Sequence, residues 1–248
     1  GRVFNEVGPR FREHYKMRNS LALAMEVQQR LLPKSDPSVP GLDISGKSRY
    51  CDETGGDYYD FLDDGGFSEG RVRIAVGDVA DHGIPSALLM ATARALLRQS
   101  SSGNDDLARI ISDANRQLTS DMDDSGRFVT IFFTAIDSRQ GTFRWVRAGH
   151  EPGMVYDSSS DNFEELEGPG MALGVDRNTE YVELKRKIKQ GEIIVIGTDG
   201  VWEAHNAEGK PFGKERLREI IRSSAGHPAK EIVRKVMDAV DAFRTPVD

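Results

Sequence analysis

The residues best suited to chemistry are carboxylates that stand beside glycines at the ends of short apolar segments. Residues 52–64 hold six acidic side chains and no basic one, together with a Gly-Gly pair and three aromatic residues; the acidic residues are Asp52, Glu53, Asp57, Asp60, Asp63 and Asp64. Such a stretch is either a solvated loop or a site whose charge a cation neutralises. Because Gly55-Gly56 permits a sharp turn, we expect Asp57 to project from the start of a strand.

A second carboxylate pattern lies in residues 77–83 (GDVADHG), where the apolar segment 71–79 ends. An Asp at the end of a buried strand is a charge removed from water, and it needs a compensating partner. A helix N-terminus offers part of this compensation, and a divalent cation offers all of it. The simpler alternative is that Asp78 or Asp81 caps the helix that begins near Gly83.

A third pattern lies in residues 194–200 (IVIGTDG), where another apolar segment ends at an Asp beside a glycine. Asp57, Asp78 and Asp199 together predict a carboxylate-rich pocket. Oxygen ligands select Mg²⁺ or Mn²⁺ over zinc, and Cys51 and His82 lack the spacing of a zinc site. A pair of such ions favours phosphoryl chemistry. The sequence has no GxxxxGK[ST] loop and no GxSxG elbow, and its one Cys lies outside any nucleophile motif.

The pattern of apolar residues predicts the elements that position these carboxylates. Helices are expected over residues 11–32, 83–97, 107–122, 214–223 and 229–243, and strands over 42–50, 58–62, 71–79, 128–137, 142–148, 153–157 and 192–197. Segment 83–97 is apolar nearly all round, which predicts a helix buried on all sides. Strands do not alternate one-for-one with helices, so antiparallel sheets covered by paired helices, an α+β fold, are favoured over a doubly wound parallel sheet.

Length and composition exclude several classes of protein. The chain has 248 residues, of which 38% are hydrophobic, and no apolar run approaches 18 residues, so the sequence predicts no membrane span. One Cys allows no intrachain disulfide and fits a reducing compartment, so we expect a cytoplasmic location, with a full-length parent that could be tethered to a membrane. The net charge of −7 and the lack of a basic stripe argue against nucleic acid as a partner.

Four motifs, in order, resemble those of bacterial SpoIIE/RsbU-type phosphatases, the bacterial branch of the metal-dependent PPM serine/threonine protein phosphatases. They are residues 55–60 (GGDYYD), 77–87 (GDVADHGIPSA), 148–150 (AGH) and 197–204 (GTDGVWEA), and the resemblance runs from about Leu31 to the C-terminus. It implies an αββα sandwich, in which two antiparallel sheets are flanked by helix pairs, with two Mn²⁺ or Mg²⁺ ions at one edge.

The resemblance also implies roles for individual residues. Asp57 would bind one ion, Asp78 would bridge both, Val79 would offer its backbone carbonyl, and Asp199 would bind the other ion; Asp57, Asp78 and Asp199 are thus the implied catalytic carboxylates. The family's last ligand lies in an Asp-Asp-x-Thr motif that leads into a final strand. Asp248 resembles the first Asp of that motif, so we expect that strand to lie beyond the sequence given.

Two histidines near these motifs have open roles. In eukaryotic relatives a His near the bridging Asp has been proposed as a general acid. The spacing between Asp78 and His82 differs by two residues from the spacing in those relatives. This difference favours His82 as a loop residue hydrogen-bonded to the backbone. For His150 a structural turn residue is favoured over a role in a second layer around the site.

Residues 1–33 are expected to form a linker or signalling helix, and residues 34–248 the phosphatase domain. A heptad-like stripe of Met17, Leu21, Ala24 and Leu31, with Gln28 at a polar seam position, fits either packing on its own domain or a parallel homodimer that couples an upstream sensor or receiver domain to the enzyme.

The resemblance implies a phosphoserine/phosphothreonine protein phosphatase in signalling such as a stress response, acting on a phosphorylated regulatory protein of the anti-sigma-factor-antagonist type. The first alternative is a catalytically weak or inactive binding module on the same fold. The second is a metal-dependent phosphodiesterase or nuclease, which the charge disfavours.

Overall fold

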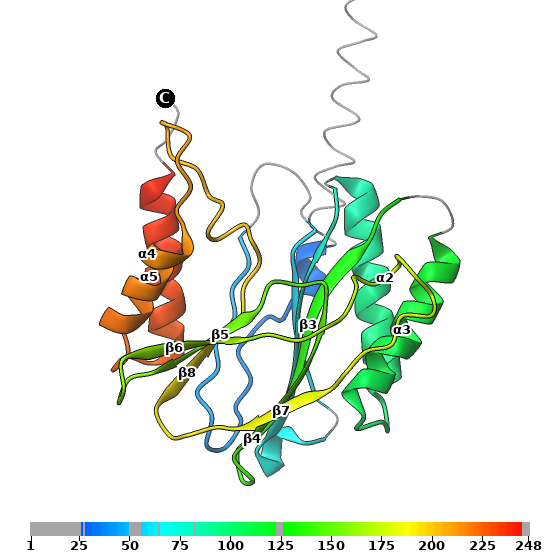
Figure 1. The fold of residues 1–248 in the computed structure, drawn as a ribbon, viewed down its shortest axis with the longest axis horizontal. Helices are drawn as coiled ribbons and strands as arrows, with labels where there is room; N and C mark the ends of the chain where they lie inside the picture. The colour runs from blue at the N-terminus through cyan, green and yellow to red at the C-terminus, as the bar shows by residue number, and fades with distance from the viewer. Residues whose placement is uncertain are drawn as a thin grey trace, which may run out of the picture.

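Two antiparallel sheets stacked between two helix pairs form the molecule (Figure 1). The computed structural model describes residues 26, 28–49, 56–63, 65–81, 83–122 and 126–244. The elements are, in chain order, β1 (Tyr58–Leu62), η1 (Phe67–Glu69), β2 (Arg71–Val79), α2 (Ile84–Ser101), α3 (Leu107–Asp121), β3 (Val129–Asp137), β4 (Thr142–Ala148), β5 (Gly153–Asp157), β6 (Asn162–Leu166), β7 (Leu184–Lys187), β8 (Glu192–Val195), α4 (Lys214–Ser223) and α5 (Ala229–Phe243).

The sheets differ in size and in the helices that cover them. The larger sheet has the order β1-β2-β3-β4-β7 and the smaller the order β6-β5-β8, and all their strand pairs are antiparallel. Helices α2 and α3 cover the outer face of the larger sheet, and α4 and α5 that of the smaller sheet (Figure 1). The predicted αββα architecture is confirmed.

Three apolar layers hold the sandwich together, and strand alternation assigns side chains to them. In β3, Ile131 and Phe133 pack toward α2 and α3, whereas Phe132 lies in the layer between the sheets. In β5, Val155 faces that middle layer and Tyr156 faces α4 and α5. Because both faces of β3 and β5 are covered, these strands are mostly apolar and do not alternate between apolar and polar residues.

Several predicted elements need correction. Residues 42–49 form no strand: Leu42 makes only an isolated bridge with Val39, and Ser45 and Gly46 donate hydrogen bonds to Asp36 instead of to a neighbouring strand. Strands β6 and β7 were not predicted, because each lies at a sheet edge and is largely polar.

Helix α2 also differs from the prediction. It continues to Ser101, beyond the predicted end at residue 97, and it is not buried on all sides, since Leu88 is 64% exposed. Of the predicted helix 11–32, only residues 26 and 28–32 are described; residues 28–31 are helical and Gln28 is buried. The stripe residues Met17, Leu21 and Ala24 lie outside the described residues. No helix in the described ranges is both long and apolar enough to cross a bilayer.

Candidate functional site

Asp57 lies directly before β1, at the edge of the larger sheet. The pairing of Tyr58 with Gly77 places Asp57 beside the end of β2, where Asp78 lies. The Asp57 carboxylate accepts a hydrogen bond from the side chain of Thr198, which follows β8 of the other sheet. Asp57 therefore joins the two sheets at one edge of the sandwich.

Asp78 and Val79 are the last two residues of β2, and Gly56 passes close to both. A Cβ atom on Gly56 would lie 2.4 Å from the Val79 carbonyl oxygen and 2.8 Å from Asp78 Oδ1. Both distances are shorter than normal contacts, so only glycine fits there. This close passage explains why a glycine precedes Asp57 in the sequence.

The loop after β8 brings the third carboxylate. A Cβ atom on Gly200 would lie 3.5 Å from Asp57 Oδ2, so this loop passes directly beside Asp57. The loop is held by a hydrogen bond of 2.8 Å from the Glu203 N–H to the Asp199 carbonyl oxygen, and Asp199 is exposed. The structure thus brings together Asp57, Asp78 and Asp199, which are far apart in the sequence.

Burial and mutual repulsion raise the pKa values of two of these carboxylates. Burial, followed by the charges of Asp57 and Asp199, raises the pKa of Asp78 from 3.8 to about 7. Burial also raises the pKa of Asp57, and the charge of Asp199 adds to this; the Thr198 hydrogen bond and the charge of Arg244 oppose it. The ionised form of Asp78 is therefore less favourable here than in water, and a bound cation would offset this cost.

The donor set fits a hard cation bound partly by water. In the described part of the chain, no three His, Cys, Asp or Glu side chains are grouped closely enough to hold a metal ion by themselves. Mg²⁺ is commonly held by one or two carboxylates while keeping several of its waters. Asp57, Asp78 and the Val79 carbonyl offer oxygen donors of that kind, and the repulsion of Asp78 by Asp57 and Asp199 is what a bound cation would relieve.

The remaining acidic residues of the 52–64 stretch serve the fold or are not described. Asp60 is 1% exposed and accepts hydrogen bonds from Arg98 Nε at 2.6 Å and Nη2 at 2.7 Å, which ties β1 to α2. Asp63 accepts a hydrogen bond from the Gly65 N–H in a turn. Asp52, Glu53 and Asp64, like Cys51, His82 and Asp248, lie outside the described residues.

The capping alternative for the second motif is wrong. Helix α2 begins after Gly83, whose φ is +87°, and no side chain caps it. Asp81 is held at φ +80° and forms an ion pair with Arg127 at 3.3 Å. Asp78 remains in the strand, with its side chain among the site carboxylates.

Three neighbours of the site were not assigned roles from the sequence. Thr198 is part of a quoted motif, but a Thr-Asp-Gly sequence alone does not show that the hydroxyl reaches Asp57. Arg244 Nη2 donates a hydrogen bond of 3.3 Å to the Gly200 carbonyl oxygen across 44 residues. Thr130 of β3 lies opposite Asp78 and contacts His150, which is buried. No local sequence signal identifies such long-range contacts.

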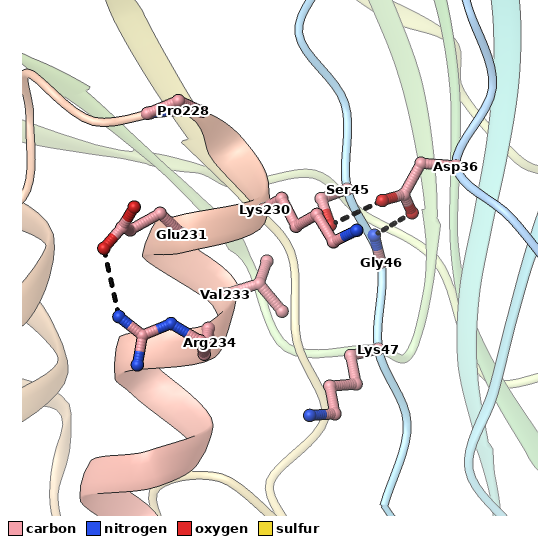
Figure 2. A pocket seen from close by; sticks show the side chains of 9 residues that line it. All are labelled: Asp36, Ser45, Gly46, Lys47, Pro228, Lys230, Glu231, Val233 and Arg234. Carbon is pink, nitrogen blue, oxygen red and sulfur yellow. Dashed lines mark hydrogen bonds and ion pairs between the residues drawn. The ribbon is translucent and has the colours of Figure 1, made fainter.

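A groove lies between residues 36–47 and the start of α5 (Figure 2). It has a volume of about 570 Å³, and none of the three site carboxylates lines it. Its acidic groups are paired within its own wall: Asp36 with Ser45 at 2.9 Å, and Glu231 with Arg234 at 3.0 Å. It is therefore a weaker candidate for catalysis.

Comparisons with known proteins place the chain in a family. The family model described as Stage II sporulation protein E (SpoIIE) matches residues 68–248. Phosphoserine phosphatase RsbU of Bacillus subtilis is 28% identical over 240 residues, which cover 94% of this chain and 70% of RsbU.

Solved structures show the same fold. The SiaA-PP2C domain of Pseudomonas aeruginosa matches with a TM-score of 0.75 at 21% identity, covering 95% of this chain and 93% of that one. RsbX in complex with magnesium matches with a TM-score of 0.55 at 17% identity, covering 82% and 85%. Together with the family match over most of its length, these findings establish that the chain belongs to the SpoIIE family of PP2C-type serine/threonine protein phosphatases.

Proposed function

We propose that this chain removes phosphate from phosphoserine or phosphothreonine on a regulatory protein, at the edge where Asp57, Asp78 and Asp199 meet. The observation that carries the proposal is the convergence of these carboxylates from three separate segments, which leaves Asp78 with a pKa of about 7. A cation bound between these carboxylates would relieve their mutual repulsion.

We assign the ligand set from the same residues. Asp57 and Asp199 would each hold one of two Mg²⁺ or Mn²⁺ ions, Asp78 would bridge them, and the Val79 carbonyl would complete the set, with Asp248 as a further ligand. When bound, such ions activate a water molecule for in-line attack and neutralise phosphate oxygens. The magnesium bound by RsbX supports a hard cation.

The protein's own residues would orient the carboxylates rather than transfer protons. Thr198 would orient the Asp57 carboxylate through its hydrogen bond. Gly56 has no side chain, which leaves space for the Asp78 carboxylate beside the chain that leads to Asp57. Arg244 fixes the Gly200 carbonyl and places a positive charge near Asp57. The binding-module alternative is less well supported, because Asp57, Asp78 and Asp199 are all retained and meet at one site.

The substrate class follows from the exposure of the site and from the relatives. Asp199 is exposed, so a phosphorylated side chain on a folded partner can reach it. RsbU is named a phosphoserine phosphatase. We therefore propose a phosphorylated regulatory protein of the anti-sigma-factor-antagonist type as the substrate, and the cytoplasm as the location.

We further propose that residues 1–33 are a separate signalling helix, that residues 34–248 form the phosphatase domain, and that the helix couples an upstream sensor or receiver domain to it through a parallel homodimer. The proposal of a helix pair rests on the heptad-like stripe, in which a polar seam residue would fix the register of the pair at some cost in stability. Gln28 is buried within the single chain, which fits the alternative that this end of the helix packs on its own domain.

Phosphate release tests the proposed function. The chain is incubated with an aryl phosphate or a phosphoserine protein in Mn²⁺, in Mg²⁺ and in EDTA, and a version extended past Asp248 is measured beside it. We expect metal-dependent turnover that Asp78→Asn reduces at least a hundredfold, whereas Asp113→Asn on the surface of α3 leaves it unchanged. Turnover by Asp78→Asn at the wild-type rate in saturating Mn²⁺ would show that the assignment is wrong.

A further inference from the structure

His150 is a buried histidine directly behind the carboxylate site. It is 3% exposed and follows Gly149, whose φ of +69° lets the chain turn at the end of β4. Its carbonyl oxygen accepts a hydrogen bond from Arg147 Nη1 at 3.2 Å, and its Nδ1 lies 2.9 Å from Thr130 Oγ1. Both the backbone and the ring are thus held in place.

Thr130 connects this ring to the strand that carries Asp78. The Thr130 hydroxyl donates a hydrogen bond of 3.3 Å to the Asp78 carbonyl oxygen. When the ring carries its proton on Nδ1, the Thr130 oxygen accepts a hydrogen bond from it while its own proton is still donated to the Asp78 carbonyl oxygen. The two contacts form one relay, from His150 through Thr130 to the peptide of Asp78.

The same ring interacts with the loop that follows β8 of the other sheet. The backbone of Gly197, two residues before Asp199, interacts with His150 and favours its charged form, but burial dominates and lowers the pKa of His150 to about 4. The ring is therefore neutral at physiological pH, with one donor and one acceptor nitrogen. Nε2 is buried and makes no hydrogen bond of normal geometry among the described residues.

We infer that His150 and Thr130 are positioning residues that fix Asp78 of the larger sheet relative to the 197–200 loop of the smaller one. Metal-binding carboxylates need such support, because residues behind the ligands set their orientation. The inference rests on the proposed function in one respect only, that the oriented carboxylates bind a divalent cation. It does not require His150 or Thr130 to touch the metal or the substrate.

If this pair had a purely structural role, removing its hydroxyl or ring would lower stability without changing metal affinity. Another threonine of β3 provides the control for that case. Thr134 lies on the same strand, is fully buried, and donates a hydrogen bond of 2.7 Å to the Arg144 carbonyl oxygen. Thr134→Val removes a hydroxyl from the same strand by the same chemical change as Thr130→Val. Thr134 lies four residues further along β3, where it pairs with Ile74 and not with Asp78.

The experiment measures Mn²⁺ affinity of the whole chain by titration calorimetry, with thermal unfolding in EDTA measured in parallel. We expect Thr130→Val and His150→Leu each to weaken Mn²⁺ binding about tenfold or more. Thr130→Ser and His150→Asn, which each keep a polar group for the relay, should bind within about threefold of wild type. Thr134→Val should lower the unfolding temperature without changing the affinity.

The double variant Thr130→Val/His150→Leu should bind Mn²⁺ no more weakly than the worse single variant, because both changes interrupt one relay. If both single variants keep their Mn²⁺ affinity and only their unfolding temperatures fall, as in Thr134→Val, this inference is overturned but the proposed function is not. Absence of Mn²⁺ binding by the wild-type chain would overturn the proposed function, and this inference with it.

Discussion

Replacing Asp78 by Asn should stabilise the metal-free protein at alkaline pH. The folded protein raises the pKa of Asp78 from 3.8 to about 7, so between these values the folded state binds more protons than the unfolded state. Stability is then lost as pH rises through this range, and the loss is complete above about pH 7. Asn carries no charge, and its Oδ1 can still accept the hydrogen bond from the Val79 N–H.

The magnitude follows from the two pKa values. At about 1.4 kcal/mol per pH unit, the change from 3.8 to about 7 corresponds to roughly 4 kcal/mol for a fully buried group. Asp78 is only partly buried, and solvent screening reduces this to about 2 kcal/mol. The gain from Asp78→Asn should therefore be about 2 kcal/mol at pH 8 and less than half of that at pH 5.

Urea denaturation in EDTA at both pH values measures this gain. Asp157→Asn is a control of opposite sign, because hydrogen bonds from Ser159 and Lys189 lower the pKa of Asp157, and its removal should destabilise the protein at pH 8. If Asp78→Asn destabilises the metal-free protein equally at pH 5 and pH 8, the carboxylates do not repel one another and the electrostatic reasoning fails.

Three further changes test the fold, the site and the N-terminal segment. Arg98→Met leaves Asp60 buried with fewer partners and should lower the free energy of unfolding by about 3 kcal/mol; a loss below about 1 kcal/mol would show that the buried Asp60 does not depend on Arg98. Gly56→Ala should reduce phosphate release at least tenfold, whereas Gly226→Ala, which meets no atom within 4 Å, should not; equal rates would contradict the close passage at Asp78. Leu21→Glu should weaken self-association in analytical ultracentrifugation and uncouple activity from an upstream input, and an unchanged sedimentation profile with unchanged regulation would show that the helix only packs on its own domain.

The order of the predicted elements favoured antiparallel sheets covered by paired helices, and the family resemblance implied that two such sheets form a sandwich. β2, β4 and β5 and helices α4 and α5 have the predicted bounds. The edge strands β6 and β7 escaped prediction, since an edge strand gains most of its stability from pairing with one neighbour rather than from apolar burial. The extended segment 42–49 was mistaken for a strand because alternation alone does not show whether a partner strand exists.

For the site, the glycine-bounded motifs predicted which carboxylates meet. They did not predict the contacts that orient those carboxylates. Thr198 reaches Asp57 across two sheets, and Thr130 reaches Asp78 and His150 from the neighbouring strand, so each contact depends on the finished fold. His150 was interpreted as a turn residue because its sequence neighbours are Gly149 and Glu151, and its buried partners are distant in sequence.

Anomalous diffraction from Mn²⁺-soaked crystals tests the central claim most directly, because it locates bound ions without reference to activity. The account predicts manganese peaks at the edge of the sandwich, within coordination distance of Asp57, Asp78 and Asp199, and their loss in crystals of Asp78→Asn. Crystals soaked at millimolar Mn²⁺ that show no peak at these carboxylates, or peaks that persist unchanged in Asp78→Asn, would contradict it.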